Sequence, residues 1–302
     1  MLHKINSALK NAGVISLLLY AFITAISNLF ISQSVSLYSP AVLLVYSFGF
    51  STLFFHLMNW NQLPKIYKTV FVYWKDFLWL NFFSVGIWVS KFYALRYMSP
   101  ALSLSITLGA IPLVTELMAC VEEKSMDRQR ILRLGVECLI LLGFIGAFLV
   151  EFKYRLFSVF LVLGFLLSFS CAVFSVYYLS WSGKLGKVLS SSQVLAVRFY
   201  LLIILGAFFS LHHPFLNAHM MLSVAMIAIF TCIAPLYLLQ FSLRKVTMKE
   251  LAIFMPLSPL ILFVLQSIFL THRFHLIQGL CFLLTMGLLF SLSFIRKTSG
   301  RD

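Results

Sequence analysis

The chain has 302 residues, of which 61% are hydrophobic, 16% aromatic and only 11% charged, and its mean hydropathy is +0.99. Soluble domains carry roughly 25% charged residues, so this composition excludes a water-soluble globule. It also excludes an intrinsically disordered chain, which needs low hydrophobicity to stay solvated. The formal net charge of +14 requires no nucleic-acid partner, because basic loops commonly face an anionic membrane leaflet. The composition predicts an integral membrane protein whose surroundings are the lipid bilayer.

Apolar runs long enough to cross a bilayer follow one another along the chain. A crossing helix needs roughly 20 apolar residues, and ten runs approach or exceed that length: 14–33, 38–58, 76–95, 100–121, 131–150, 156–180, 194–211, 219–241, 250–270 and 275–295. The longest break, from Asn59 to Lys75, has room for an interfacial turn or short helix but not for a soluble domain. We therefore expect an all-α membrane protein with ten transmembrane helices.

The basic residues give an expected orientation. With ten spans, 18 of the 23 Lys and Arg residues fall on one side of the membrane and five on the other. Cytoplasmic loops carry the excess, so both termini are expected in the cytoplasm, and Arg198 counts among the cytoplasmic charges. No retention or transit signal is evident. A multi-pass protein of the plasma membrane or bacterial inner membrane is the expected location.

The thiols and imidazoles do not form a recognisable metal site. All five cysteines fall inside or at the edge of apolar runs, without a CxxC pair, so a disulfide or zinc framework is not expected. His212, His213 and His219 lie near one another in sequence, but their loop has no acid or cysteine to complete a zinc site. We expect neither a metal nor another cofactor.

An internal repeat relates the two halves. Ala94-Leu95-Arg96 followed by Ser99 matches Ser242-Leu243-Arg244 followed by Thr247 at an offset of 148, and Pro112 matches Pro259 at an offset of 147. This divides the chain into five-span units, 1–150 and 151–302. Because five is odd, the second unit must enter the membrane from the opposite side, which is a recurring arrangement in secondary transporters. Chance similarity between apolar helices remains the alternative.

The chain resembles the EamA-type members of the drug/metabolite transporter superfamily. The likeness lies in the segment Ala94-Leu95-Arg96-Tyr97-Met98-Ser99-Pro100-Ala101 running into Ile111-Pro112-Leu113, then Leu134-Gly135 with Gly143 and Gly146, and is echoed by residues 243–247 through Pro256 and Pro259 to Gln278-Gly279. Many members carry a Gly-Glu pair after the proline-containing helix, where this chain has Glu122-Glu123 and Thr271-His272. The resemblance implies ten helices in two inverted five-helix repeats, similar in layout to carriers of amino acids and of S-adenosylmethionine.

Polar residues within the spans are candidates for a substrate pathway, since polar groups avoid lipid. The first span carries Tyr20, Thr24, Asn28 and Ser32 at a spacing of four, which places them on one helix face. The substrate-binding candidates are Thr24, Asn28, Trp88, Lys91, Ser105, Tyr178, Tyr237, Gln240 and Ser258. For the small residues around Ser105, close helix packing is the competing explanation.

Lys91 is the most informative single charge. It lies well inside the third span, five residues before Arg96. It could meet a substrate carboxylate or close an outer gate, or its ammonium could reach the headgroups by snorkelling.

Two acids and four prolines complete the candidates. Glu116 and Glu137 are candidates for proton coupling, because burial favours a neutral carboxyl, with pairing to Arg130 or Arg133 as the alternative. Pro112, Pro235, Pro256 and Pro259 are expected to interrupt their spans and to free carbonyls there.

These features favour a transporter of a small polar metabolite that works by alternating access, its substrate an amino acid or a nucleoside derivative similar to S-adenosylmethionine. No G-x-S-x-G or H-E-x-x-H motif occurs, so an enzyme is not expected. A membrane-embedded enzyme and a non-transporting structural protein are the alternatives. Small multidrug exporters of the superfamily that this chain resembles depend on an acid in their first helix, and none lies between Val14 and Gln33 here. The resemblance therefore favours exchange or uptake of zwitterions over proton-driven cation export. Whether the protein forms a homodimer is left open.

Overall fold

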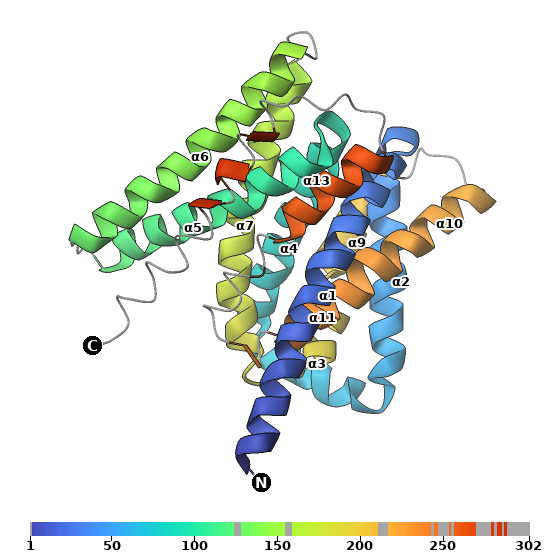
Figure 1. The fold of residues 1–302 in the computed structure, drawn as a ribbon. Coiled ribbons are helices and arrows are strands. Elements are labelled where there is room, and N and C mark those ends of the chain that lie inside the picture. Colours follow the sequence, from blue (N-terminus) through green and yellow to red (C-terminus); the bar gives the residue numbers. More distant parts are fainter. Residues whose placement is uncertain are drawn as a thin grey trace.

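The computed structural model describes residues 2–123, 128–154, 159–210, 217–242, 245–246, 254 and 257–269, with short pieces at 279–280, 283–285 and 287–288. Helices account for nearly all of these residues, and no strand occurs among them (Figure 1). The expected all-helical class is confirmed.

The first half of the chain forms α1 Leu2–Leu37, α2 Pro40–Met58, the 3₁₀ turn η1 Trp60–Gln62, α3 Leu63–Val72, α4 Trp74–Tyr97, α5 Pro100–Glu123 and α6 Arg128–Tyr154. The second half forms α7 Val159–Leu185, α8 Ser191–Val197, α9 Tyr200–Ser210, α10 Ala218–Ile227, the π-helix η2 Ala228–Ile233, α11 Ala234–Ser242 and α13 Leu257–Phe269. The turn η1 and helix α3 occupy the long break between the second and third spans, so the expectation of a short helix there is confirmed.

Seven helical stretches are long and apolar enough to cross a membrane: Ala12–Leu37, Pro40–Met58, Trp74–Tyr97, Pro100–Val121, Val159–Leu185, Ser191–Ser210 and Ala218–Ser242. The chain is therefore a multi-pass integral membrane protein. Two shorter apolar helices, Leu134–Val150 and Leu257–Phe269, coincide with the fifth and ninth expected spans. The tenth expected span, 275–295, lies mostly outside the described residues.

Two of the helix junctions contain a Ser-Pro pair. Pro40 and Pro100 are the first residues of α2 and α5, where a missing N–H costs nothing because that position has no intrahelical partner. The residue before a proline is disfavoured in the helical conformation, and this ends the preceding helix. Met98 after α4 is fully extended. The tight connections make α1 and α2, and α4 and α5, consecutive neighbours.

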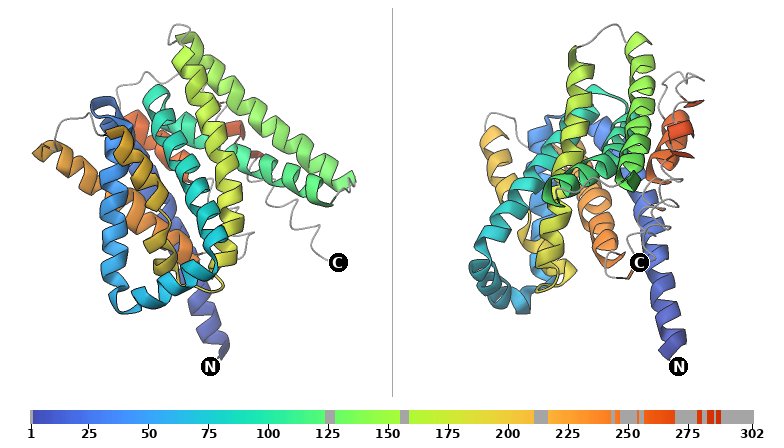
Figure 2. Two further views of the ribbon diagram at one scale, coloured as in Figure 1. Left: turned by 180° about the vertical axis from the view of Figure 1, so that it is seen from behind. Right: turned by 90° about the vertical axis from the view of Figure 1, so that its left-hand side faces the viewer.

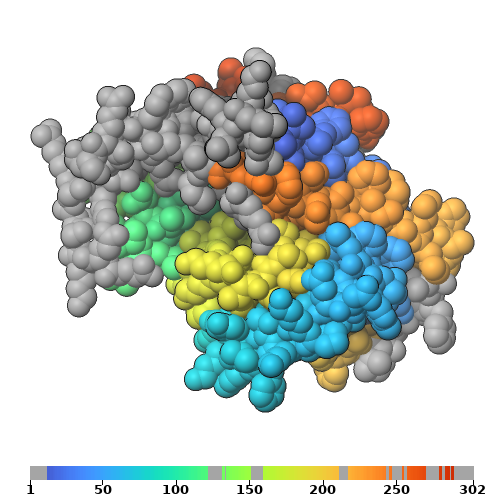
Figure 3. All heavy atoms as spheres, turned by 90° about the horizontal axis from the view of Figure 1, so that it is seen from below, coloured from blue at the N-terminus to red at the C-terminus, as the bar shows by residue number. Residues whose placement is uncertain are grey.

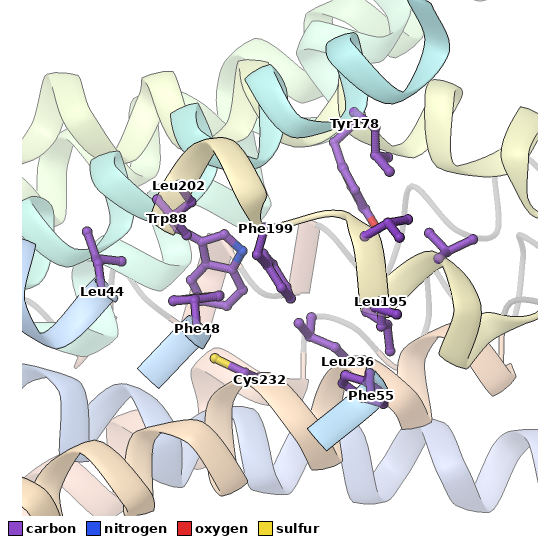
Figure 4. Close-up of a cluster of buried hydrophobic side chains, with 14 of the residues drawn as sticks. Leu44, Phe48, Phe55, Trp88, Tyr178, Leu195, Phe199, Leu202, Cys232 and Leu236 are labelled. Carbon is purple, nitrogen blue, oxygen red and sulfur yellow. The ribbon is translucent and has the colours of Figure 1, made fainter. Parts of the chain in front are cut away.

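The helices pack around a core shared by both halves. Helix α4 lies along α7, α1 along α11, and α2 along α9, and the views of Figures 1 and 2 show α5 and α6 leaning away from the α1–α2 side of the molecule. The largest group of buried apolar side chains draws on α2, α4, α7, α8, α9 and α11; Figure 4 shows its centre. This core surrounds the residues of the candidate site.

The structure corrects the expected course of the seventh span and the placement of one charge. The seventh span is not one helix but two, broken at Arg198 and Phe199. Arg198, which was counted among the charges of the cytoplasmic loops, is 2% exposed and lies within the span Ser191–Ser210, so it is not a loop residue. A count of charges between hydropathy runs cannot distinguish a residue at the end of a span from one at a break within it.

The prolines act differently from one another. Helix α5 continues through Pro112, whereas π-helical turns precede Pro235. Pro259 lies in the first turn of α13, where a proline is tolerated, so it does not interrupt the described helix. Pro256 lies outside the described residues.

Close packing of α4 against α7 yields a matched pair of tests at Gly86 and Gly49. A Cβ added at Gly86 would fall on the ring of Phe174, whereas one at Gly49 in α2 would meet nothing within 4 Å. Gly49→Ala should raise the apparent melting temperature in detergent, since alanine is the better helix former by about 1 kcal/mol. Gly86→Ala should lower it, because overpacking costs about 1–3 kcal/mol. Shifts in the same direction would contradict the α4–α7 packing.

Candidate functional site

The break between α8 and α9 is held by one asparagine of α4. The Asn81 side chain donates from Nδ2 to the carbonyl of Val197 (3.0 Å) and accepts from the N–H of Leu201 at Oδ1 (3.3 Å). A helix broken inside a membrane leaves peptide groups without partners, and these must be satisfied by protein. Asn81 supplies one partner on each side of the break. Arg198 and Phe199 are thereby held in a non-helical segment inside the protein.

A second irregular segment lies in the eighth span. Pro235 has no N–H to donate to the carbonyl of Thr231, four residues earlier, and the backbone winds into π-helical turns over Ala228–Ile233. Such bulges are frequent at functional sites. Cys232 lies in this segment, fully buried, and Figure 4 shows its sulfur directed toward the core between α2, α4 and the α8–α9 break.

Arg198 is a buried cation held against aromatic rings. Its guanidinium carbon lies 4.2 Å from the ring centroid of Tyr178 and 4.7 Å from that of Phe199. The nearby carbonyl of Val197 is occupied by Asn81. Among the described residues, Arg198 has no ion pair, and its Nε has no hydrogen-bond acceptor. A buried guanidinium normally pairs with an acid, and within the described part of the chain Arg198 lacks such a partner.

Lys91 is a second cation in the same region. Its Nζ lies 4.9 Å from the centroid of the Trp88 ring, and its charge is within electrostatic range of Cys171 on α7 and Cys232 on η2. The ammonium is thus directed into the protein. No described residue forms a hydrogen bond or ion pair with it. The Trp88 Nε1 donor is also buried without an acceptor in the described part of the chain, and Figure 4 shows it facing Phe199.

The cation–π contacts and the electrostatic neighbours of these groups define one central cluster, in which Lys91 and Arg198 share the neighbour Cys232. The charge of Arg198 reaches Tyr20, Tyr178 and Cys232, and Cys171 is a neighbour of both Lys91 and Tyr20. The central cluster comprises Tyr20, Trp88, Lys91, Cys171, Tyr178, Arg198 and Cys232. It brings together α1, α4, α7, the α8–α9 break and η2. It contains two cations, two phenols, two thiols and the indole ring of Trp88.

Several candidates from the sequence border this cluster. Gln240 donates from Nε2 to the Tyr178 hydroxyl (3.1 Å) and to Ser182 Oγ (3.2 Å), so it orients a cluster residue. Thr24 interacts with the Tyr20 side chain. Asn28, 1% exposed, donates to the carbonyl of Thr24 in its own helix at 2.6 Å.

Other candidates lie elsewhere. Ser105 donates to Ala101 in its own helix at 2.6 Å, Ser258 is buried in the first turn of α13 with no hydrogen-bond partner among the described residues, and Tyr237 is 38% exposed. The structure does not bring these three residues into the central cluster.

The two candidate coupling acids are buried outside the central cluster. Glu116 on α5 is 7% exposed and Glu137 on α6 is 0% exposed, and neither is among the electrostatic neighbours of Lys91 or Arg198. The side chains of Arg130 and Arg133, their alternative partners, lie outside the described residues.

Small polar residues join α5 to α7. Ser103 and Ser168 share a hydrogen bond of 2.9 Å between α5 and α7, and Thr107 donates to the carbonyl of Ser168. These contacts satisfy hydroxyls that would otherwise be exposed to lipid. No group of three metal-ligating side chains occurs within the described ranges.

Polar contacts join the end of α2 and η1 to the start of α8 at one end of the molecule. Ser192 at the start of α8 donates to Asn59 Oδ1 at 3.0 Å, and the amides of Gln193 and Gln62 contact each other. Figure 3 shows this end, where the segment from the end of α7 into α8 lies between the α2–α4 side and α11. We call the contacts of Asn59 and Gln62 with α8 the polar latch.

Comparisons with known proteins establish the fold alone. No family model matches the sequence, and no curated protein matches it. Ten solved chains match. One of them, described as "Crystal structure of protein", has a TM-score of 0.65, 14% sequence identity and coverage of 98% of both chains. The similarity shows that the architecture extends over essentially the whole chain.

Arg198, Asn81 and Cys232 were not among the residues expected from the sequence. A signal for Arg198 was present, because a charged residue inside a span is a functional candidate by default and Arg198 falls within the apolar run 194–211. Asn81 and Cys232 had no such signal, since their roles depend on contacts with distant segments.

Replacing Asn81 tests the construction of the break. Asn81→Ala should destabilise the protein by about 3 kcal/mol, because one buried and one half-buried backbone group each lose a partner at about 1–3 kcal/mol. The measurement is the apparent melting temperature in detergent. Ser170→Ala, which removes only an exposed hydroxyl bonded within its own helix, is the control. An Asn81→Ala protein as stable as the control would contradict this account of the break.

Proposed function

We propose that the protein is a membrane transporter that carries a small polar metabolite by alternating access between two inverted five-helix repeats, residues 1–150 and 151–302. The observation that carries this proposal is the pattern of helix packing. If the halves correspond, α1 matches α7, α2 matches α8–α9, α4 matches α10–α11, and α5 matches α13. Exchanging the halves should then convert each packed pair into another packed pair.

The most closely packed pairs exchange in this way, although in the described part of the chain the pair α1 with α4 has no closely packed counterpart between α7 and α10–α11. The contact of α4 with α7 corresponds to that of α11 with α1, and the contact of α5 with α7 corresponds to that of α13 with α1. Exchanging the halves turns the pair α2 with α9, and likewise the pair α5 with α13, into the same pair. Both of these pairs are packed. A non-repeated bundle would have no reason to follow this rule, so the pattern supports the repeat.

Two glycines support the same correspondence at residue level. A Cβ at Gly164 would lie 3.2 Å from Cβ of Tyr97 and 3.4 Å from Cβ of Met98. A Cβ at Gly13 would lie 2.7 Å from Cβ of Lys245 and 2.9 Å from Cγ1 of Val246. The offset of 148 that relates the sequence motifs also takes Tyr97 and Met98 to Lys245 and Val246. The first helix of each unit thus approaches the same place in the other unit.

The irregular helices indicate where the proposed substrate site lies. In secondary transporters, substrate sites lie at the repeat interface and are formed by discontinuous helices. Here the α8–α9 break and η2 both border the central cluster, which also receives α1 and α4 from the first unit. This position favours transport over a structural role, which would not need an unpaired buried cation such as Arg198. We place both termini in the cytoplasm of a plasma or bacterial inner membrane, as the positive-inside rule indicates.

Reversible locking of the polar latch tests alternating access. In a protein that keeps the buried Cys171 and Cys232 and whose other cysteines are replaced, Asn59→Cys with Ser192→Cys should allow a reducible bifunctional thiol reagent to join the end of α2 to α8. Saturable uptake into proteoliposomes from a panel of amino acids, nucleosides, organic acids and sugar phosphates should be abolished by the reagent and restored by reductant, because the carrier must open at each end in turn.

Each single-cysteine variant treated in the same way is the control for modification alone. Saturable uptake that persists in the fully crosslinked double variant would contradict alternating access at this end. Absence of saturable uptake of every compound would contradict transport itself.

Proton coupling through the buried acids is tested separately. Glu116→Gln and Glu137→Gln each replace a carboxyl with an amide of nearly the same shape, so a coupling acid should lose the pH dependence of uptake while the protein remains folded. Ser267→Ala, an exposed hydroxyl bonded within α13, is a neutral comparison. An unchanged pH profile in both glutamine variants would exclude these acids.

A further inference from the structure

We infer that the central cluster binds a small organic anion, with Arg198 and Lys91 as its charge partners. This inference rests on the proposed transport function and narrows its substrate class. The cluster contains two cations, and among the described residues no carboxylate pairs with either. Arg198 is 2% exposed, whereas Lys91 is half-buried. A buried charge without a partner is costly, and a ligand of opposite charge removes that cost at Arg198.

The hydrogen-bonding groups left open in the cluster are donors. Arg198 Nε and Trp88 Nε1 are buried donors with no acceptor among the described residues, and the ammonium of Lys91 carries three more. A carboxylate or phosphate accepts hydrogen bonds without donating any, so it matches this set. A ligand whose polar groups are themselves donors does not.

The shape of the site favours an oxyanion in particular. A guanidinium presents a planar fork that fits carboxylate and phosphate oxygens in a bidentate manner. The Arg198 fork is fixed between the rings of Tyr178 and Phe199, and little side-chain freedom remains to be lost on binding. Helix α9 starts two residues later, at Tyr200, and a helix N-terminus adds positive potential to a site that is already cationic.

The same features disfavour the two substrates suggested by the family resemblance. An amino acid would present an ammonium group, and S-adenosylmethionine would add a sulfonium, to a cluster that already holds two cations. The acids of the described chain that could neutralise such a ligand, Glu116 and Glu137, are not neighbours of these cations. The net charge of the ligand, and not its size, is therefore the expected basis of selection.

Ligand binding to the detergent-purified protein tests this inference without requiring transport. The probes are succinate and glycerol 3-phosphate as anions, leucine as a zwitterion and S-adenosylmethionine as a cation, each titrated while the melting temperature is measured. A ligand that binds the native state raises that temperature in a saturable manner. We expect a shift with at least one anion and none with leucine or S-adenosylmethionine.

Three variants test the named residues. Arg198→Gln and Lys91→Gln should each weaken anion binding about 10- to 100-fold, the equivalent of one charge-assisted hydrogen bond. Arg198→Lys keeps the charge but loses the fork, and it should bind more weakly than the parent and more tightly than Arg198→Gln. Lys184→Gln is the matched control, because Lys184 also lies over a tryptophan, 4.0 Å from the Trp181 centroid, but is exposed and outside the cluster.

The outcomes separate this inference from the transport proposal. Anion binding lost in the cluster variants and kept in Lys184→Gln supports the inference, whether or not uptake is found. Binding of leucine or S-adenosylmethionine without any anion overturns it while leaving latch-sensitive transport intact. Absence of a shift with both anions also overturns it, as does anion binding that is equal in Arg198→Gln and Lys184→Gln.

Discussion

Within a bilayer, a helix can be broken only where protein groups replace the lost backbone hydrogen bonds. Asn81 meets this condition by bonding the carbonyl of Val197 before the break and the N–H of Leu201 after it. The side chain of Arg198 is therefore not needed to bond these two backbone groups. Its position between two aromatic rings, and with it the charge of the central cluster, depends on that one asparagine of a neighbouring helix.

The energetics indicate that Arg198 is retained for a reason other than stability. Burial of an unpaired ion costs several kcal/mol even after relaxation, whereas a cation–π contact returns about 1–2 kcal/mol. The rings of Tyr178 and Phe199 therefore offset only part of the cost. Both irregular spans, α8–α9 and α10–η2–α11, belong to the second half of the chain, whereas α2 and α4 of the first half are continuous helices. The irregular backbone beside the central cluster therefore comes from the second half.

Much of the fold could be predicted from the sequence because lipid imposes length and apolarity on each crossing helix. The Ser-Pro junctions at Pro40 and Pro100 and the short helix before Trp74 follow from local chemistry alone. Lys91, Trp88 and Tyr178 could be identified because polar or amphipathic residues are conspicuous in apolar runs. The break at Arg198 could not, since hydropathy does not report which peptide groups are satisfied, and the Asn81–Val197 contact joins residues 116 positions apart. The same limitation concealed Cys232, whose place in the cluster depends on the π-helical turns before Pro235.

The most direct test of the account is the melting temperature of the ligand-free Arg198→Gln protein relative to the parent. If Arg198 is an uncompensated cation held for an anionic ligand, removing its charge should leave the melting temperature unchanged or raise it, because the desolvation cost disappears. A fall of several degrees in the ligand-free protein would contradict the account, because it would mean that Arg198 is a stabilising structural residue.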